Sequence, residues 1–396
     1  MKFGIITLVS DNYGNKYQNY AVERLLSKYG EVTTYSLENL YCASSDSAKR
    51  GILQKLNPSY IKKVLRARMM YRFDYNATDT SIIQSLLYVN KNKKKIIRLK
   101  EERSRRFREF SKKYLHISDV QLNYENSVDE NWIQSVDYFF CGSDQIWNPS
   151  YATTSKVAFC SFAPEKTVAI APSFGVSEIP QYRKDEYSSY LKKIYKLSVR
   201  ENVGRDIIKN LSGRDVEVLL DPTMALNVSE WRKIVKKPDV IMPEHYIVCY
   251  FLGQIDKVYR KKINEFAEKI GLPLVMLFDI TSEEYYTFDP AEVLYTINNA
   301  DFVLTDSFHG SVFSILFHRN FYVFGRNEGG ASMNSRVETL LEKFQLTDRM
   351  FTGDSIGINS KKWRVVESIL EEEQNKTVTY IENTIKIKEG ILRNEI

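Results

Sequence analysis

The sequence predicts an α/β fold of two Rossmann-like domains, each built on a parallel sheet, that face each other across a cleft. Its 396 residues suggest two or three domains, at about 150 residues per domain. Short apolar runs alternate with amphipathic stretches, and this alternation restarts after the segment Pro238–Pro243. Hydrophobic residues make up 43% of the chain and charged residues 27%, which is typical of a globular protein and excludes wholesale disorder.

The first half alternates between apolar runs of strand length and helical patterns. An expected strand over Lys2–Val9 is followed by a polar loop over Ser10–Asn15 and a helix from about Lys16 to Tyr29. Further strands are expected near Val32–Tyr35, Tyr138–Cys141, Val168–Ala171, Leu197–Arg200 and Val216–Leu220, with helices at Lys184–Ile194 and Val203–Leu211. These elements predict a first domain over residues 1–238.

The second half repeats the pattern over residues 239–396. Its expected strands are Tyr246–Leu252, Leu274–Phe278, Phe302–Thr305 and Phe321–Phe324. Its expected helices are Lys257–Ile270, Pro290–Asn299, Phe308–Phe317 and Ser335–Phe344, and Gly271 ends the first of them. The tail from about Trp363 is helical and charged, and it could return to the first domain.

A basic insert at about residues 45–115 interrupts the first domain. Between Lys49 and Tyr114 there are 20 Lys or Arg residues and 5 Asp or Glu residues, although the whole chain carries a net charge of only +6. Apolar residues recur there at helical spacing, at Ile96, Leu99, Phe107, Phe110 and Tyr114. The basic face is either a solvated helix surface or a platform for an anionic membrane or a polyphosphate substrate. No nucleic-acid-binding motif supports a third interpretation, nucleic acid.

The cysteine pattern favours reduced thiols rather than a disulfide or zinc framework. Cys42, Cys141, Cys160 and Cys249 lie far apart without a CxxC pair, and two of them stand in apolar runs. The N-terminus lacks a signal-peptide pattern, and no apolar run approaches the ~18 residues of a membrane span. We therefore expect a cytoplasmic protein that is at most peripheral to the inner face of a membrane.

The richest candidate site is Asp306–Ser311, which follows an expected strand and opens an expected helix. Free N–H groups at a helix start, with the Ser307 and Ser311 hydroxyls, form a seat for an anion. Gly310 would let a ligand approach the backbone, and His309 can transfer a proton near neutral pH. The alternative is a plain helix cap with a histidine on the helix surface.

A second candidate site, Cys141–Pro149, also ends an expected strand. Ser143, Asp144, Gln145 and Trp147 offer a hydroxyl, a carboxylate, an amide and an aromatic ring, which together suit a sugar. The alternative is a polar turn with a buried tryptophan.

Polar groups also stand at two further strand ends and at the start of one late helix. Arg200 could grip a carboxylate or a phosphate, or it could form a surface pair with Glu201. Asn334 and Arg336 stand at the expected start of a late helix, as anion ligands or as a cap. Asn15 lies in the polar N-terminal loop. No Walker A or GxGxxG motif is present, so ATP hydrolysis and NAD chemistry have no support.

Taken together and in this order, these motifs resemble the polysaccharide pyruvyl transferase family over roughly residues 1–40 and 120–346. The resemblance rests on the runs Phe140–Pro149, Ser198–Glu201, Asp221–Thr223 and Ala300–Ser311 and on Ser335–Arg336. It implies a fold similar to the GT-B glycosyltransferases, phosphoenolpyruvate as donor and a sugar as acceptor. The product would be a pyruvate ketal on a cell-surface polysaccharide or its lipid-linked precursor, with release of phosphate.

The resemblance also implies a role for each candidate residue. His309 matches the general acid, Arg200 the arginine that grips the donor, and Asp144 would orient or deprotonate an acceptor hydroxyl. Donor contacts are expected from Ser307, Phe308, Gly310, Ser311, Asn334 and Arg336. Acceptor contacts are expected from Asn15, Ser143, Gln145 and Trp147. The chemistry needs no metal and no cofactor besides the donor substrate.

Two rival functions share these residues. A GT-B glycosyltransferase would bind a nucleotide sugar and ignore phosphoenolpyruvate. A non-catalytic glycan-binding relative would keep ligand binding after His309→Ala. In either pyruvyl transfer or glycosyl transfer, the basic insert could dock the protein on a membrane that carries a lipid-linked acceptor.

Overall fold

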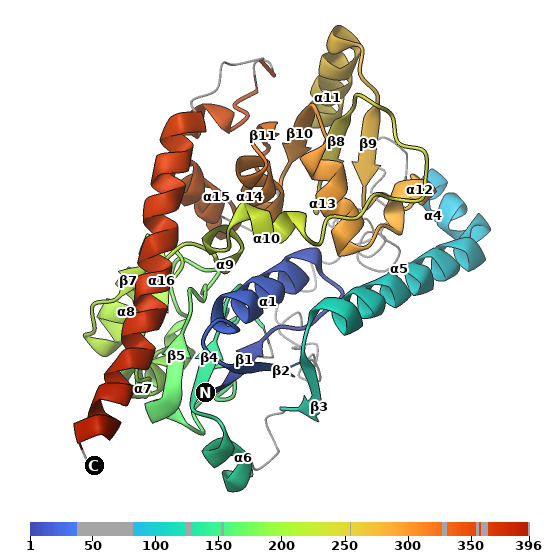
Figure 1. Cartoon of the computed structure of the whole chain (residues 1–396). Coiled ribbons are helices and arrows are strands. Elements are labelled where there is room, and N and C mark those ends of the chain that lie inside the picture. Colours follow the sequence, from blue (N-terminus) through green and yellow to red (C-terminus); the bar gives the residue numbers. More distant parts are fainter. Residues whose placement is uncertain are drawn as a thin grey trace.

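The computed structural model describes residues 1–37, 82–122, 129–151, 154–253, 255–326, 331–353, 356–357 and 363–394. In this part of the chain the fold is α/β, with two larger parallel sheets and a third sheet of two strands. Figure 1 shows the two larger sheets in different halves of the molecule, with helices packed around them. The expected α/β class with two parallel sheets is therefore confirmed.

The first sheet has five parallel strands in the order β3-β2-β1-β4-β5. Their bounds are β1 (Lys2–Thr7), β2 (Glu31–Ser36), β3 (Ile117–Gln121), β4 (Tyr138–Cys141) and β5 (Thr167–Ala169). β1 and β4 are adjacent and parallel, and Ile5 on β1 pairs with Phe140 on β4. Both side chains are fully buried, as the continuous apolar runs of these strands require. The strand order reverses between β1 and β4, which is where Rossmann-type sheets bind ligands.

The second sheet has four parallel strands in the order β11-β10-β8-β9. Their bounds are β8 (Ile247–Tyr250), β9 (Leu274–Leu277), β10 (Phe302–Thr305) and β11 (Asn320–Val323). The strand order of this sheet reverses between β8 and β10. The remaining pair, β6 (Ser198–Val199) and β7 (Glu217–Val218), forms the two-stranded sheet. Each larger sheet thus has one reversal point that can hold a ligand.

The expected helices are present, and the structure adds four short ones, Glu130–Ser135, Pro222–Ala225, Val228–Arg232 and Glu283–Tyr286, that were not expected. In chain order the helices are α1 (Tyr13–Leu26), α4 (Ile82–Lys91), α5 (Lys93–Tyr114), α6 (Glu130–Ser135), α7 (Lys184–Lys193), α8 (Asn202–Ser212), α9 (Pro222–Ala225), α10 (Val228–Arg232), α11 (Lys257–Ile270), α12 (Glu283–Tyr286), α13 (Pro290–Asn298), α14 (Phe308–Leu316), α15 (Ala331–Lys343) and α16 (Trp363–Asn394). Asp256 caps the start of α11, and Gly271, with a positive φ of 70°, ends it.

Most elements differ from the sequence-based expectations by a few residues at one or both ends, and two of these differences bear on the candidate site. Helix α1 begins at Tyr13 rather than Lys16, because the Asn12 side chain accepts from the backbone N–H of Asn15 and caps the helix there. Helix α15 begins at Ala331, so Asn334 and Arg336 lie inside the helix rather than before it. The three cysteines that the structure describes, Cys141, Cys160 and Cys249, are buried free thiols, and Cys42 lies outside the described residues.

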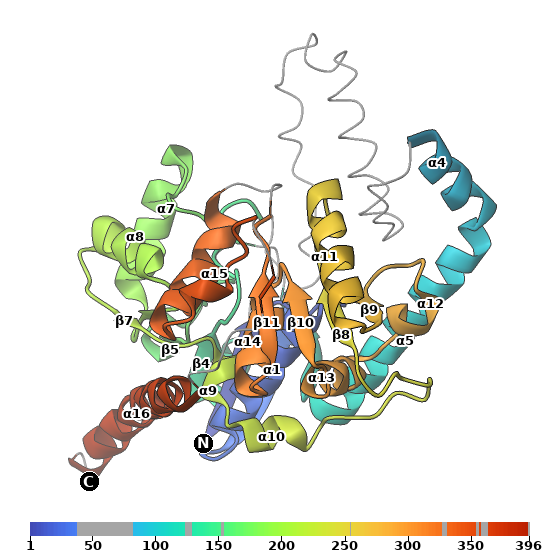
Figure 2. The ribbon, with the colours of Figure 1, turned by 90° about the horizontal axis from the view of Figure 1, so that it is seen from above.

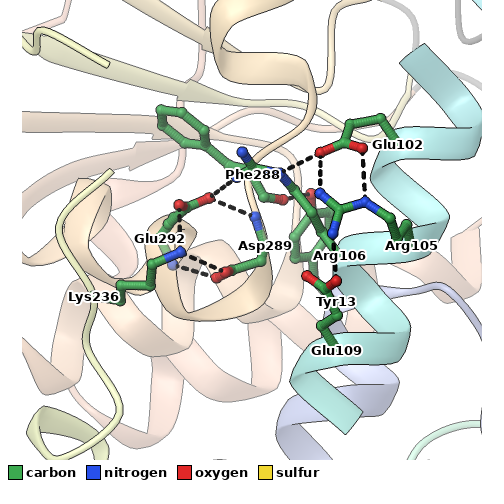
Figure 3. Close-up of polar contacts among 9 residues, drawn as sticks. All are labelled: Tyr13, Glu102, Arg105, Arg106, Glu109, Lys236, Phe288, Asp289 and Glu292. Atoms are coloured by element: carbon green, nitrogen blue, oxygen red, sulfur yellow. Dashed lines mark hydrogen bonds and ion pairs between the residues drawn. The ribbon is translucent and has the colours of Figure 1, made fainter. Parts of the chain in front are cut away.

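Helix α5 of the basic insert joins the two halves. Its buried Ile96 and Leu99 pack against Ile280 and Tyr286 of the second half. Arg106 of α5 donates to Glu292 of α13 at 2.7 Å, and Glu292 is fully buried. Figure 3 shows this carboxylate held between Arg106 and Lys236, whose Nζ lies 2.9 Å away. The apolar stripe predicted on the insert is therefore an internal surface, and residues 45–81 of the insert lie outside the described residues.

The C-terminal helix α16 packs back on the first sheet, along one edge of the molecule in Figure 1. The Tyr380 hydroxyl donates to the carbonyl of Ala169 on β5 at 2.9 Å. The Tyr138 hydroxyl of β4 donates to the carbonyl of Thr384 on α16 at 3.2 Å. Among the described residues, no helix is long and apolar enough to span a membrane.

Candidate active site between the two sheets

A cavity of about 440 Å³ lies where the reversal points of the two larger sheets meet. Loops after β1 and β4 line it from the first half, and loops after β8, β10 and β11 line it from the second. The lining residues are Leu8, Ser10, Asn12, Asn15, Asp144, Gln145, Tyr151, Leu252, Asp306, Ser307, Phe308, His309, Arg326 and Arg336. The carboxyl ends of parallel strands thus supply the site, as expected for open α/β sheets.

On the first half, three polar side chains form a chain of hydrogen bonds along the cavity wall. Ser10 donates to the Asn15 side chain at 2.5 Å. Asn15 Nδ2 in turn donates to Asp144 Oδ2 at 2.6 Å. Asp144 has a positive φ of 54°, which aspartate tolerates better than most residues. The loop after β1, the first turn of α1 and the loop after β4 therefore hold one carboxylate at a defined place at the cavity.

On the second half, Asp306 organises the loops that follow three strands. It accepts from the backbone N–H groups of Leu252 and Gly253, both at 2.7 Å. It also accepts from Arg326 Nε at 3.0 Å and from Arg326 Nη2 at 3.3 Å. This two-point contact fixes the direction of the Arg326 guanidinium, which lines the cavity.

Helix α14 starts at the cavity and carries the candidate proton donor in its first turn. The Ser307 side chain caps the helix by accepting from Gly310 N at 3.4 Å. His309 is buried, and its Nε2 forms no hydrogen bond with any described residue. Burial lowers the pKa of His309 below 6.5, with Arg200 and Arg336 acting in the same direction and Asp221 and Asp144 opposing. Burial therefore favours the neutral imidazole over the imidazolium, and a negative charge nearby would act against this preference.

Arg336 reaches the same cavity from α15. It is buried, and burial together with the nearby Arg200 lowers its pKa. With its amide oxygen facing Arg336, Gln145 accepts from both terminal nitrogens of the guanidinium, at 3.0 and 3.1 Å. Asp144 Oδ1 lies 4.0 Å from Arg336 Nη1. Because the charged forms of both Arg336 and His309 are disfavoured here, a bound anion would stabilise both.

Arg200 does not line the main cavity. Its guanidinium lies 4.8 Å from the centre of the Phe308 ring, in a small adjoining pocket that Phe308 and Arg336 share with the cavity. Arg200 Nη1 contacts Asp221 Oδ2 at 2.5 Å, and both side chains are buried. Burial opposes ionisation of Asp221, yet Arg200, with help from His309 and Thr223, leaves the pKa of Asp221 below its ordinary value. The charge of Arg200 is therefore already compensated by a protein carboxylate.

Two predicted acceptor residues lie away from the cavity. The Trp147 side chain is fully buried, stacks on Phe159 with ring centroids 5.0 Å apart, and donates to the Ala158 carbonyl. Ser143 is 1% exposed and donates to the Ala171 carbonyl at 2.6 Å. Both side chains therefore belong to the core of the first half, which agrees with the alternative interpretation of a polar turn with a buried tryptophan. Gln145 of the same run does line the cavity.

Two residues of the α14 start also differ from expectation. A Cβ at Gly310 would lie 2.3 Å from Thr305 Oγ1, so this glycine lets the helix pack on β10 rather than letting a ligand approach. Ser311 is fully buried and donates to the Ser307 carbonyl at 3.1 Å. Neither residue lines the cavity, whereas Ser307, Phe308 and His309 do. The side chain of Asn334 lies outside the described residues.

Sequence reasoning missed two charged residues of the site. Arg326 follows the strand expected at Phe321–Phe324, so extending the search for polar groups after strands to this one would have found it. Asp221, the partner of Arg200, stands in one of the recognised motifs, where no role was assigned to it. Among the described residues, no group of three His, Cys, Asp or Glu side chains gathers in a way that could hold a metal ion.

Comparisons with known proteins agree with the motifs. A model of the polysaccharide pyruvyl transferase family matches residues 12–328. No curated protein matches the chain. Among solved structures, the chain is distantly similar to a UDP-GlcNAc 2-epimerase from Methanocaldococcus jannaschii, with 10% identity over 94% of this chain and 92% of that one and a TM-score of 0.44. It is also similar to a UDP-GlcNAc 2-epimerase from Neisseria meningitidis, with 11% identity over 100% of both chains and a TM-score of 0.41. A UDP-glucosyltransferase from Polygonum tinctorium shares 10% identity over 98% of both chains, with a TM-score of 0.44. Because the family model spans most of the chain, the protein belongs to the polysaccharide pyruvyl transferase family.

Proposed function

We propose that this protein transfers pyruvate from phosphoenolpyruvate to two hydroxyls of a glycan, forming a cyclic ketal and releasing phosphate. One observation supports this proposal most. The cavity brings a buried arginine and a buried histidine, Arg336 and His309, both with lowered pKa, together with the hydrogen-bonded carboxylate of Asp144, whose Oδ1 lies 4.0 Å from Arg336 Nη1. The arginine and the histidine suit an anionic donor, and the neighbouring carboxylate suits a hydroxyl acceptor.

Phosphoenolpyruvate is small and carries up to three negative charges, so it needs more than one cation. Arg326 and Arg336 both line the cavity and come from different elements, the loop after β11 and helix α15. We assign the carboxylate and the phosphate of the donor to these two guanidinium groups, with Ser307 at the start of α14 beside them. Arg200 would then act one layer behind, through its contact with Phe308.

His309 would supply the proton that starts the reaction. The donor's negative charge raises the pKa of the neighbouring imidazole and so favours its protonated form. Proton transfer to the methylene carbon of the donor makes a methyl group and leaves an oxocarbenium-like centre at the adjacent carbon. Positioned acid catalysis of this kind typically contributes about 10²–10⁴-fold to a rate.

Asp144 would orient the acceptor. One acceptor hydroxyl attacks the oxocarbenium carbon and gives up its proton, which Asp144 can accept directly. The bond from that carbon to the phosphate oxygen then breaks, and a second hydroxyl of the same sugar closes the ring while its proton leaves with the phosphate. Return of the Asp144 proton to His309 through solvent restores the site. One donor and one diol thus give one ketal and one hydrogen phosphate, with the atoms, protons and charge balanced and no metal or further cofactor drawn upon.

The acceptor in this proposal is a sugar of a cell-surface polysaccharide or of its lipid-linked precursor, reached from the cytoplasm. Asn15, Gln145 and Tyr151 lie beside Asp144 on the cavity wall and offer donors and acceptors for sugar hydroxyls. Contact with the inner face of a membrane through the basic insert would bring a lipid-linked acceptor to this wall.

Phosphate release from phosphoenolpyruvate, measured with and without lipid-linked oligosaccharides from cells, tests the proposal. We expect release that depends on the acceptor and is lost in His309→Ala. A protein that ignores phosphoenolpyruvate but binds a nucleotide sugar would instead be a glycosyltransferase. A protein whose glycan binding survives His309→Ala without any turnover would be a non-catalytic relative.

A further inference from the structure

Helix α4 and the first half of α5 combine strong positive charge with exposed apolar side chains. Residues 82–100 contain six Lys or Arg residues and no Asp or Glu. Leu86, Leu87 and Ile97 are exposed by 44%, 63% and 44%, unusual values for large aliphatic side chains in one short stretch. Scattered exposed apolar residues are common, but three of them among cations form a surface that needs an explanation.

These residues share one side of a nearly continuous helix. The backbone N–H of Asn92 donates to the Tyr88 carbonyl, and that of Ile96 donates to the Asn92 carbonyl, both at 2.9 Å. Helical hydrogen bonding therefore continues across the junction of α4 and α5, and residues three or four positions apart lie on the same face. Leu87 and Lys94 are seven positions, or two turns, apart and Ile97 follows three positions later, so they lie on the side away from the buried Val89 and Ile96.

The cations of this face differ from those further along α5. Arg105 and Arg106 form ion pairs with Glu102, and Arg106 also with buried Glu292. Lys93, Lys94 and Arg98, by contrast, are exposed and form no ion pair with any described residue. The internal contacts of α5 thus account for one part of its basic charge and leave this outer part unexplained.

We propose that Leu86, Leu87, Lys93, Lys94, Ile97 and Arg98, here called the α4–α5 patch, dock the protein on an anionic lipid membrane. The lysines and the arginine would contact lipid phosphates, and the three aliphatic side chains would enter the boundary between headgroups and acyl chains. The charge of the patch favours an anionic membrane as the partner, because all of its charged residues are cations and its apolar residues lie between them. Figure 2 shows α4 and the adjoining end of α5 at the periphery, on the other side of the molecule from α7.

This proposal extends the proposed function and rests on it, because membrane docking is useful to the enzyme only if its acceptor lies on a membrane. A lipid-linked acceptor is confined to the membrane surface, and docking would concentrate the enzyme there. Vesicle binding needs neither donor nor acceptor, however, so the docking proposal and the pyruvyl transfer proposal can fail separately.

The test is sedimentation of the whole protein with vesicles of phosphatidylcholine alone and of phosphatidylcholine mixed with phosphatidylglycerol. We expect binding only to the mixed vesicles, weakened by salt. Lys93→Glu/Lys94→Glu and Leu86→Ser/Leu87→Ser should each reduce the partition coefficient by about tenfold or more. The matched control is Lys192→Glu/Lys193→Glu on α7, an exposed lysine pair with the same charge change, which should bind like the wild type.

Several outcomes would overturn the proposal. If the α7 control lost as much vesicle binding as the Lys93/Lys94 variant, the attraction would come from net charge alone. If the leucine double variant bound vesicles like the wild type, the patch would make no apolar contact with the membrane. A wild-type protein that does not bind the mixed vesicles would also overturn it. So would a change from dimer to monomer in the leucine variant without a change in vesicle binding, because the patch would then be a contact between copies of this chain. Circular dichroism melting checks that every variant is folded.

Discussion

Gly14 of α1 lies directly against the imidazole of His309 on α14. A Cβ placed on Gly14 would be 2.5 Å from both Cε1 and Nδ1 of the His309 ring. Carbon atoms do not approach this closely, so only glycine leaves room for the histidine in its present position. The first half of the protein therefore sets the place of the candidate proton donor, which belongs to the second half.

Gly14→Ala should displace the His309 ring and lower kcat, by about tenfold or more if His309 is the proton donor. Stability should change little, because alanine is favoured over glycine within a helix by roughly 1 kcal/mol, which offsets the local clash. The double-mutant cycle with His309→Ala isolates this effect. In the His309→Ala background, Gly14→Ala should have no further effect on kcat, and a second loss of similar size there would contradict the assignment.

The pH dependence of the reaction should change when the donor binds. In the free protein the pKa of His309 lies below 6.5 because the ring is buried, so kcat/KM for the donor should fall as pH rises through that lowered value. In the complex the donor's charge raises the pKa, so kcat should fall only at higher pH. Rate profiles for both constants check this, and the falling limb should vanish in His309→Gln.

The same pKa shift has a consequence for stability. Below pH 6.5 an unfolded chain protonates this histidine while the folded protein resists, so the folded protein binds fewer protons. The stabilising contribution of neutral His309 should be complete above pH 6.5 and decline as pH falls toward the lowered pKa. Urea unfolding of wild type and His309→Gln between pH 5 and 8 should show their difference narrowing or reversing at the acidic end.

Replacing Arg200 alone should destabilise the fold. Arg200→Met leaves the buried Asp221 carboxylate without its cation, and breaking a buried pair typically costs about 3–5 kcal/mol. Arg200→Met/Asp221→Asn should recover part of this loss in urea unfolding. Activity then separates two roles for Arg200. Recovered turnover in the double variant means that Arg200 acts through packing, whereas a folded but inactive double variant means that its charge is needed by the donor.

Arg326 should matter for donor affinity although it belongs to no motif that the sequence singled out. Arg326→Met removes a cavity-lining guanidinium that Asp306 holds in place, and loss of a charged hydrogen bond to the donor should raise the donor KM by about tenfold to 100-fold. Arg205→Met, at an exposed arginine of α8, is the control and should leave KM unchanged. An unchanged KM in Arg326→Met would remove this residue from the donor site.

The cluster in Figure 3 should stabilise the junction of the two halves. Arg106→Ala removes a partner of the fully buried Glu292, and we expect a loss of about 1–3 kcal/mol in urea unfolding, since Lys236 remains as a partner. Glu102→Ala, which removes a partly exposed carboxylate of the same cluster, should cost under about 1 kcal/mol. Equal losses in the two variants would contradict a special role for the buried carboxylate.

Local patterns in the sequence were sufficient to predict most elements of the fold. Helix α11 and strand β10 have the expected bounds, because a helical apolar period that ends at Gly271 and a short buried apolar run are both properties of neighbouring residues. The strand β3 was missed, since Ile117–Gln121 carries three polar residues, Ser118, Asp119 and Gln121, and lies at the edge of its sheet. The positions of His309, Asp144 and Asn15 after strands already pointed to one cavity.

The sequence by itself determined the fold class and which loops would meet, and only the tertiary structure decided which side chains in those loops reach the cavity. Trp147 and Asp144 stand three residues apart, yet one is buried in the core and the other lines the site. Arg200 and Asp221 form a buried pair, and Gly14 makes room for His309 across nearly three hundred residues. Such contacts depend on how whole sheets pack, because the packing decides which distant residue compensates the charge of a side chain and which residues fill the space around it.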